Sequence, residues 1–229
     1  MAGIKEAFGI VEVLRQANPA TTAALASVAF MKHLTKGECL FRDKETTSSL
    51  YFVVEGNFSL HKYNSAGEKK VIFVYGPGKL LNETMLRNFP ESINCEALDD
   101  AQVVGFPRTP FIAAMAADFH LTGAIMDSMA TKIRRMYRQL KNTTGSVSGD
   151  KKIAAKLWKL SRDIGIPCDE GIRIDLKLTI TYFAEMLGAK RETVSRQVKS
   201  LIEEGLVIRR KDTFIIPDRE KLMRYFKSL

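Results

Sequence analysis

The stretch TITYFAEMLGAKRETVSRQVKSLIEE, residues 179–204, predicts two helices joined by a tight turn. Apolar residues recur at i, i+3, i+4 and i+7 in its first half, as on one buried helical face. These residues are Ile180, Phe183, Ala184 and Leu187. Thr179 is the predicted N-cap, because its hydroxyl can accept from a backbone N–H of the first turn. Gly188 can adopt the left-handed conformation that ends a helix.

The second predicted helix carries an apolar and a polar stripe. Val194, Val198, Leu201 and Ile202 form the apolar one. About a third of a turn away lies the polar stripe of Glu192, Ser195, Arg196 and Lys199. Arginine can donate two parallel bonds to guanine, and a carboxylate can accept from the amino group of cytosine. Two such helices are typical of a DNA-reading helix-turn-helix, although a merely solvated amphipathic helix is the alternative. The candidate DNA-contacting residues are Lys190, Arg191, Glu192, Thr193, Ser195, Arg196 and Lys199.

Positive charge is concentrated in the half of the chain that holds this stretch. The 229 residues carry a net charge of +9, and the isoelectric point is about 9.5. Residues 1–131 have 12 Lys+Arg against 14 Asp+Glu, net −2, and residues 132–229 have 23 against 12, net +11. A near-neutral part followed by a basic part favours a sensor joined to a domain that binds a polyanion.

Composition argues against several classes of protein. The three cysteines, Cys39, Cys95 and Cys168, are far apart and form no C-x-x-C pair, so a reducing cytoplasm is expected. We find no bilayer-spanning apolar run and no signal-peptide core. The sequence also has no nucleophile elbow, P-loop, H-E-x-x-H motif or convincing carboxylate pair. We therefore expect no enzyme, no catalytic residue, no metal ligand and no cofactor.

The first half of the chain predicts helices followed by strands. Residues 4–34 have helical periodicity with a break at Asn18-Pro19. From residue 37 to about residue 106 the pattern changes to short strands separated by glycine turns. The clearest strands are expected at residues 50–54, 58–61, 71–75 and 103–106. Such a series is typical of an antiparallel barrel or sandwich.

A short helix is predicted at residues 110–118 and a long one at 119–142. The long helix carries apolar residues at intervals of three or four: Leu121, Ile125, Met129, Ile133, Met136 and Leu140. This narrow seam favours pairing with a second copy of the helix, while packing on the barrel is the alternative. The small and polar residues 143–149 are the expected hinge. The predicted domains are therefore residues 1–118, 119–142 and 150–229.

After the hinge, a further helix is predicted around Ile153, Leu157, Leu160 and Ile164, with Asp150 as a possible cap. A short strand is expected at residues 172–176. Residues 206–208 and 214–216 flank a basic turn at 209–213 and predict a hairpin, or wing, whose arginines can lie near phosphates. Residues 218–226 predict a last short helix.

Four motifs together resemble one family over nearly the whole chain. They are LGAKRETVSR (187–196), LIEEGL (201–206), LYFVVEG (50–56) and GPGKLLNE (76–83). The chain resembles bacterial transcription regulators of the catabolite-activator and fumarate–nitrate-regulator (Crp/Fnr) family. That resemblance implies an α+β protein with an N-terminal cyclic-nucleotide-binding-like β-barrel (jelly roll), a long dimerisation helix and a C-terminal winged helix-turn-helix. It also implies a homodimer on an inverted-repeat operator in double-stranded DNA, an effector and RNA polymerase as a partner.

Carried onto this sequence, the resemblance makes Glu192 and Arg196 readers of a C·G pair and a neighbouring guanine. Arg191 matches the catabolite-activator type and Ser195 the fumarate–nitrate type, so only a TGA-like core of the half-site is expected. Lys190 stands where a capping Ser or Thr is usual, and Tyr182 where an acidic or glutamine partner for the N-cap is usual. We expect a weaker start of the second helix, with DNA binding retained.

The effector pocket departs from the cyclic-nucleotide pattern. Where the family places an arginine and a small hydroxyl residue for the phosphate, this chain has Glu91 and Ser92. A carboxylate repels a phosphate and removes its bidentate partner, so cyclic AMP is not expected. A different small molecule, or a pocket filled by side chains, are the two alternatives. The expected lining is Leu80, Asn82, Glu83, Ser92, Asn94, Met136 and Tyr137.

Three further hypotheses compete with an effector-controlled regulator. A thiol or redox switch at a cysteine needs an exposed thiolate of low pKa, whereas buried inert cysteines are the alternative. A regulator that binds DNA without any ligand is another possibility. A regulatory subunit for a channel or kinase is disfavoured by the helix-turn-helix. No cysteine cluster for an iron–sulfur centre is present in the sequence, and His33, His61 and His120 are expected to be ordinary residues.

Overall fold

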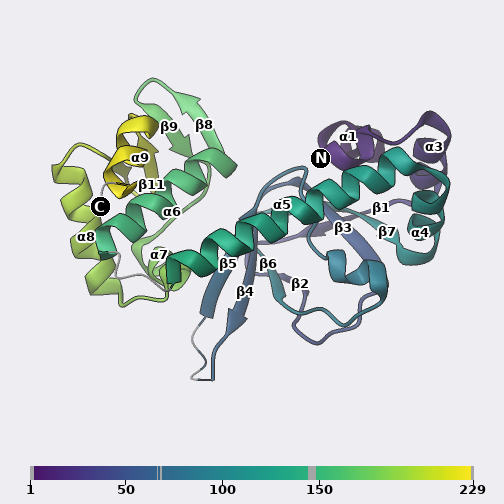
Figure 1. Cartoon of the computed structure of the whole chain (residues 1–229), viewed down its shortest axis with the longest axis horizontal. Helices are drawn as coiled ribbons and strands as arrows, with labels where there is room; N and C mark the ends of the chain where they lie inside the picture. The colour runs from purple at the N-terminus through teal and green to yellow at the C-terminus, as the bar shows by residue number, and fades with distance from the viewer. Residues whose placement is uncertain (1–2, 66, 68, 144–147, 228–229) are drawn as a thin grey trace. The chain divides into compact units, whose positions relative to one another are not determined.

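The computed structural model describes residues 3–65, 67, 69–143 and 148–227 (Figure 1). The chain forms two compact units, of which the first comprises residues 1–60 and 75–144 and the second residues 61–74 and 145–229. Helices and antiparallel sheets occur in the structure, as the predicted α+β class requires. The expected hinge falls largely outside the described residues, and the predicted domain limits at residues 118, 142 and 149 stay predictions.

The first unit begins with three helices, α1 (Ile4–Ile10), α2 (Glu12–Arg15) and α3 (Pro19–Val28). The predicted break at Asn18-Pro19 is the start of α3. The Asn18 side-chain oxygen accepts from the Thr21 N–H at 2.9 Å, and Pro19 fills the first helical position, which needs no donor. Helical character was predicted as far as residue 34, which is wrong for the last five residues. They form β1 (Phe30–Leu34), because pairing with another strand outweighs local periodicity.

Antiparallel strands were predicted for this region, in a barrel or a sandwich. Within the described residues they form two separate sheets and no single closed barrel. One sheet has the order β1-β7-β3, with β7 at Ala101–Pro107 and β3 at Ser49–Glu55. The other has the order β2-β6-β4-β5. Its strands are β2 (Cys39–Phe41), β6 (Asn94–Ala97), β4 (Phe58–Tyr63) and β5 (Lys69–Tyr75). The sequence had no clear signal for the short strands β2 and β6.

Two helices follow the sheets, α4 (Arg108–Ala117) and α5 (Phe119–Thr143), close to the predicted limits (Figure 1). Asp118 lies between them and fixes the start of α5. Its carboxylate accepts from the backbone N–H of Asn18 at 2.8 Å and of His120 at 3.0 Å. The Asn18 bond is the largest of the contacts that lower the pKa of Asp118. A side chain that accepts at the first turn stabilises a helix and here also holds α5 to the start of α3.

Part of the predicted dimer seam on α5 belongs to the core of its own unit. Leu121 and Ile125 are fully buried and pack in one cluster with residues of the β1-β7-β3 sheet. Their assignment to a partner contact is therefore wrong, because a buried side chain has no surface left for a second chain. Met129 is partly buried at the edge of this cluster, and Ile133 and Met136 are exposed. The side chain of Leu140 lies outside the described residues.

The second unit combines helices with a small antiparallel sheet. Its order β10-β11-β9-β8 joins β10 (Ile208–Arg210), β11 (Thr213–Ile216), β9 (Gly171–Ile174) and β8 (Gly165–Cys168). The wing and the strand near residue 172 are confirmed, whereas β8 was not predicted. The helices are α6 (Gly149–Asp163), α7 (Ile180–Leu187), α8 (Arg191–Glu203) and α9 (Arg219–Lys227). Asp150, predicted as a possible cap, lies in the first turn of α6, and its carboxylate accepts from the Tyr225 hydroxyl of α9 at 2.5 Å.

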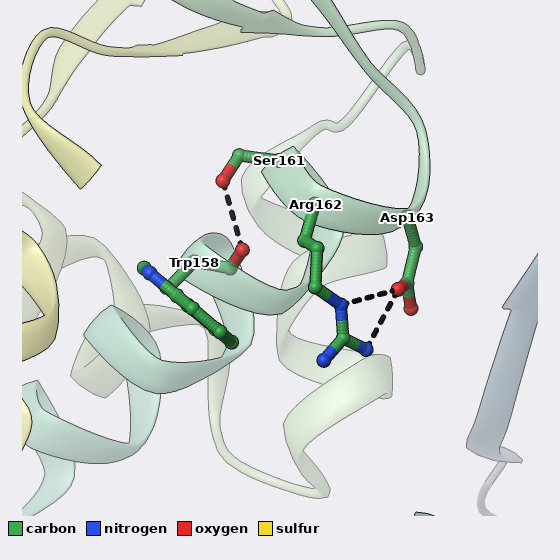
Figure 2. Close-up of polar contacts among 4 residues, drawn as sticks. All are labelled: Trp158, Ser161, Arg162 and Asp163. Carbon is green, nitrogen blue, oxygen red and sulfur yellow. Dashed lines mark hydrogen bonds and ion pairs between the residues drawn. The ribbon is translucent and has the colours of Figure 1, made fainter. Parts of the chain in front are cut away.

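Trp158 holds α9 against α6. The guanidinium carbons of Arg162 and Arg219 lie 5.5 and 5.6 Å from the centre of its ring, within the range of a cation–π contact. The Phe226 ring meets the same indole edge-on at 6.0 Å. Figure 2 shows that Arg162 also donates two hydrogen bonds, of 3.0 and 2.8 Å, to one oxygen of Asp163. The contacts of Trp158 with Arg219 and Phe226 hold α9 against α6.

Candidate nucleic-acid interface and effector groove

The turn between α7 and α8 has the predicted geometry. The Thr179 hydroxyl accepts from the Tyr182 N–H at 3.1 Å and caps α7. Gly188 lies in the left-handed region at φ 61° and ψ 43°, where a glycine meets no steric penalty, and ends the helix. On the buried face, Ile180, Phe183 and Ala184 are as predicted. Met186, three residues after Phe183, is buried as well, and Leu187 is half-buried.

The cap gives a direct stability prediction. We expect Thr179→Ala to lower the free energy of unfolding of the second unit by about 1 kcal/mol, since one first-turn N–H loses its partner. The measurement is urea unfolding followed by the fluorescence of Trp158, which is the only tryptophan of the chain. Thr181→Ala, an exposed position in the same helix, is the control and should change stability by less than about 0.5 kcal/mol. Equal effects of the two substitutions would contradict the capping role.

Helix α8 presents the candidate DNA-contacting residues to solvent. Val194, Val198 and Leu201 are buried as predicted, but Ile202 is exposed and its assignment to the apolar stripe is wrong. On the opposite side the exposed residues are Lys190, Arg191, Glu192, Ser195, Arg196 and Lys199, and Thr193 is half-buried. The structure thus brings all seven candidates to the start and outer face of one helix.

The start of α8 has hydrogen-bond donors and charged side chains that can contact a phosphate or a base. Lys190 occupies the N-cap position and makes no side-chain capping bond, as the sequence indicated. The first backbone N–H groups of the helix therefore remain able to donate to another acceptor, such as a phosphate oxygen. Among the described residues, the side chains of Arg191, Glu192 and Arg196 take part in no hydrogen bond or ion pair, so they can be directed at base edges. Lys199 forms an i,i+4 pair with Glu203 at 3.7 Å.

The wing hairpin places three cations at its tip. Arg209 donates to the Lys211 carbonyl at 3.0 Å, and Lys211 takes a left-handed conformation at φ 54° to close the turn. Arg210 is held by Glu170 at 2.7 Å, and the hydrogen bond to that carboxylate raises the pKa of Arg210. Glu170 already neutralises Arg210. The better candidates for phosphate contacts are therefore Arg209 and Lys211.

Two of the seven expected effector-pocket residues line a groove that the described residues form along α5. Leu80 and Glu83 line one groove, described below. Asn82 is buried and donates to the Ser49 carbonyl at 2.9 Å. The other four lie outside that groove: Ser92, Met136 and Tyr137 are exposed, and Asn94 accepts from the Asp43 N–H at 3.2 Å. Glu83 is the first residue of η1 (Glu83–Arg87), a short 3-10 helix.

Glu91, which stands at the expected phosphate position, is a buried structural acceptor. One carboxylate oxygen accepts from the Thr47 hydroxyl at 2.7 Å and from the Asn82 amide at 2.8 Å. The other accepts from the Thr84 hydroxyl at 2.9 Å. The side chain is 2 % exposed. Three protein donors therefore already surround the carboxylate and tie η1 to the segment before β3.

A groove of about 590 Å³ runs along α5 within the first unit. Its other walls are α2 and residues 75–83. On α5 the lining residues share one stripe, with His120, Gly123, Asp127 and Thr131 at i, i+3, i+7 and i+11. The sequence analysis missed this stripe because it followed apolar periodicity, whereas the groove face consists of small and polar residues. The sequence signal for this groove face is the spacing of the polar and small residues along the same helix.

The cysteines differ in accessibility. Cys95 is buried, and burial raises the pKa of its thiol well above the usual value, which makes it unreactive. Cys168 is exposed on β8, and Cys39 is half-buried on β2. The described residues contain no cluster of His, Cys, Asp and Glu that can hold a metal ion. In that same part of the chain, every helix is too short or too polar to span a bilayer.

Comparison with known proteins agrees with both units. A family model of the cyclic nucleotide-binding domain matches residues 31–118, and one of the Crp-like helix-turn-helix domain matches residues 151–225. The transcriptional regulator ArcR of Staphylococcus aureus is 27 % identical over 187 residues, which cover 80 % of this chain and 78 % of ArcR.

Solved structures share the fold. FixK2 from Bradyrhizobium japonicum superimposes with a TM-score of 0.74 at 20 % identity, over 86 % of this chain and 96 % of FixK2. A CRP-family regulator from Thermus thermophilus superimposes with a TM-score of 0.70 at 21 % identity, over 86 % of this chain and 97 % of that regulator. The two domain matches, in the order expected of a sensor and a helix-turn-helix, agree with the sequence motifs and with the exposed face of α8. The chain belongs to the Crp/Fnr family of DNA-binding transcription regulators.

Proposed function

We propose that the protein works as a cytoplasmic homodimer that binds an inverted-repeat operator through two copies of α8 and responds to a small molecule other than cyclic AMP. The single observation that carries this proposal is the outer face of α8. There, Arg191, Glu192 and Arg196 are exposed and form no hydrogen bond or ion pair with other described residues, at the helix end that enters a major groove. RNA polymerase is the further partner that a regulator of transcription needs.

The dimer is supported by exposed apolar residues on α5. Phe119, Met126 and Ile133 recur at every seventh position, and their side chains are 81, 60 and 47 % exposed. Met136 and Tyr137 extend the same stripe and are also exposed. Exposed apolar residues that recur every seven positions are typical of a helix that pairs with a copy of itself. This stripe replaces the predicted seam and retains its members Ile133 and Met136.

The experiment that tests the proposal is a titration with a palindromic duplex carrying TGA-type half-sites, beside a scrambled duplex, over a series of salt concentrations. Arg196→Ala should weaken operator binding about 5- to 150-fold per half-site, because one bidentate contact to guanine is worth about 1–3 kcal/mol. Binding to the scrambled duplex should change far less, since it depends on phosphate contacts.

Arg224→Ala is the matched control, because Arg224 is exposed on α9 and its loss changes the charge equally. It should leave operator binding within about twofold of wild type. Equal losses in the two variants, on both duplexes, would mean that Arg196 contributes only charge and that the base-reading role is wrong. If wild type preferred neither duplex with or without candidate effectors, the proposed operator would have to be abandoned.

A ligand-free or thiol-controlled regulator is the second candidate. The exposed Cys168 on β8 is the accessible thiol, whereas the buried and unreactive Cys95 is not suited to sensing. Operator binding measured under hydrogen peroxide and under dithiothreitol tests the thiol-controlled regulator. A redox switch requires a change that Cys168→Ser removes, and an effector-controlled protein responds equally under both conditions.

A further inference from the structure

We propose that Tyr225 is a positioning residue for DNA recognition, because its hydroxyl joins the start of α6 to the end of α8 and thereby fixes how α8 presents its base-reading side chains. The hydroxyl donates to the Asp150 carboxylate at 2.5 Å and lies 3.4 Å from a carboxylate oxygen of Glu204. Three helices, α9, α6 and α8, therefore meet at one oxygen atom. This inference rests on the proposed function, since it concerns the same face of α8.

The two carboxylates relate differently to the hydroxyl. A hydroxyl has one proton, so the shorter bond, to Asp150, is the main one and Glu204 holds the second position. Glu204 is the C-cap residue of α8, where the helix dipole makes a negative charge unfavourable. A nearby O–H group offsets that cost and stabilises the end of α8. Burial and the two carboxylates raise the pKa of the Tyr225 hydroxyl, so it keeps its proton at neutral pH.

The docking of α9 does not depend on this hydroxyl. Leu222 is fully buried, and the Phe226 ring meets the Trp158 indole edge-on at 6.0 Å. These apolar contacts remain when Tyr225 is replaced by phenylalanine. The substitution should therefore leave α9 in place and remove only the polar link.

The polar link restrains α8 in a way that its core contacts do not. The buried face of α8 is apolar, with Val194, Val198 and Leu201 in the core. Apolar contacts are non-directional, whereas a hydrogen bond has a preferred distance and angle and can fix the end of a helix. Arg196 lies eight residues before Glu204, or about 12 Å along the helix axis. A shift at the end of this rigid helix therefore also moves the side chain that reads a base.

A second contact between the same two helices supports this role. Gly149, the first residue of α6, lies against the side-chain amide of Gln197 on α8, since a Cβ added at Gly149 would overlap that amide. Gln197 directly follows Arg196 in the sequence. The start of α6 thus touches α8 next to a base-reading residue and, through Tyr225, at the end of the helix.

The first part of the test measures the link without DNA, by hydrogen–deuterium exchange on the full chain. The backbone N–H groups of residues 204–206 donate to carbonyls of the last turns of α8. Tyr225→Phe should speed their exchange at least about fivefold, which corresponds to about 1 kcal/mol of local opening, and leave α7 unchanged. Tyr63→Phe, which removes an exposed hydroxyl, is the matched control and should change neither segment. Circular dichroism verifies that both variants are folded.

The second part measures operator binding in a double-mutant cycle. Tyr225→Phe should weaken binding to the palindromic duplex at least about fivefold, in the range seen for coupled residues. Binding to the scrambled duplex should stay within about twofold, because it depends on phosphate contacts. Arg196→Ala should cost at least about threefold less in the Tyr225→Phe background than in wild type, since Arg196 is then no longer held in place to read guanine. A mere loss of stability would leave the cost of Arg196→Ala unchanged.

Equal exchange of residues 204–206 in Tyr225→Phe and wild type would overturn the inference, whatever the DNA titrations give. Specific operator binding with the same cost of Arg196→Ala in both backgrounds would also overturn it, and the operator proposal would stand. Wild-type binding that prefers neither duplex would remove the operator proposal and with it the positioning role, and faster exchange would then show only a structural link.

Discussion

Ile133→Asp is expected to convert the dimer into monomers and to weaken operator binding about 100- to 10,000-fold, the range by which linking two binding events raises affinity. The substitution places a charge in the middle of the apolar stripe formed by Phe119, Met126 and Ile133 on α5. Pairing would bury that carboxylate against a second copy of the same carboxylate, which is costly without a partner. A monomer then holds one half-site alone and loses the gain in effective concentration.

The mass is measured by analytical ultracentrifugation and the affinity by titration of the palindromic duplex. Arg134→Gln, which changes the net charge by the same amount at an exposed position, should stay dimeric and bind normally. Half-site binding by Ile133→Asp should remain and should be insensitive to the spacing of the half-sites. A dimer of undiminished affinity would show that α5 pairs along a different face.

Helix α5 shows what periodicity alone can establish. Its length and its amphipathic character were predictable, because a long helix with an apolar seam has a strong sequence signal. The start of the seam was misplaced, since Leu121 and Ile125 are as regular and as apolar as the residues that face outward. Only the position of the β1-β7-β3 sheet distinguishes a residue that packs on the chain's own core from one that faces solvent.

The helix-turn-helix was more predictable than the sensor for a physical reason. Its geometry is local, because a cap at Thr179, a left-handed Gly188 and the periods of two adjacent helices fix it. The groove instead depends on contacts between residues far apart in the chain, such as Lys132 with Glu83, which are 49 positions apart. No short motif encodes such a pairing. For the same reason only two of the expected pocket residues, Leu80 and Glu83, line the groove.

The second large effect concerns the buried carboxylate of Glu91. Glu91→Leu should lower the free energy of unfolding of the first unit by about 3–5 kcal/mol, because Thr47, Asn82 and Thr84 lose their common acceptor inside the protein. Glu91→Gln keeps the shape and one carbonyl acceptor, so its cost should be only about 1–2 kcal/mol. Ser92→Ala, at the exposed neighbouring position, should be nearly neutral.

The location of the only tryptophan makes the measurement selective. Trp158 belongs to the second unit, so its fluorescence follows that unit, while circular dichroism follows both. Glu91→Leu should shift the circular dichroism transition to lower urea and leave the Trp158 transition in place. Stability within about 1 kcal/mol of wild type would mean that the three donors find other acceptors.

The same geometry predicts that isothermal titration of cyclic AMP into wild type gives no detectable heat. The enclosed Glu91 carboxylate offers the phosphate of cyclic AMP neither a hydrogen-bond donor nor a counter-charge.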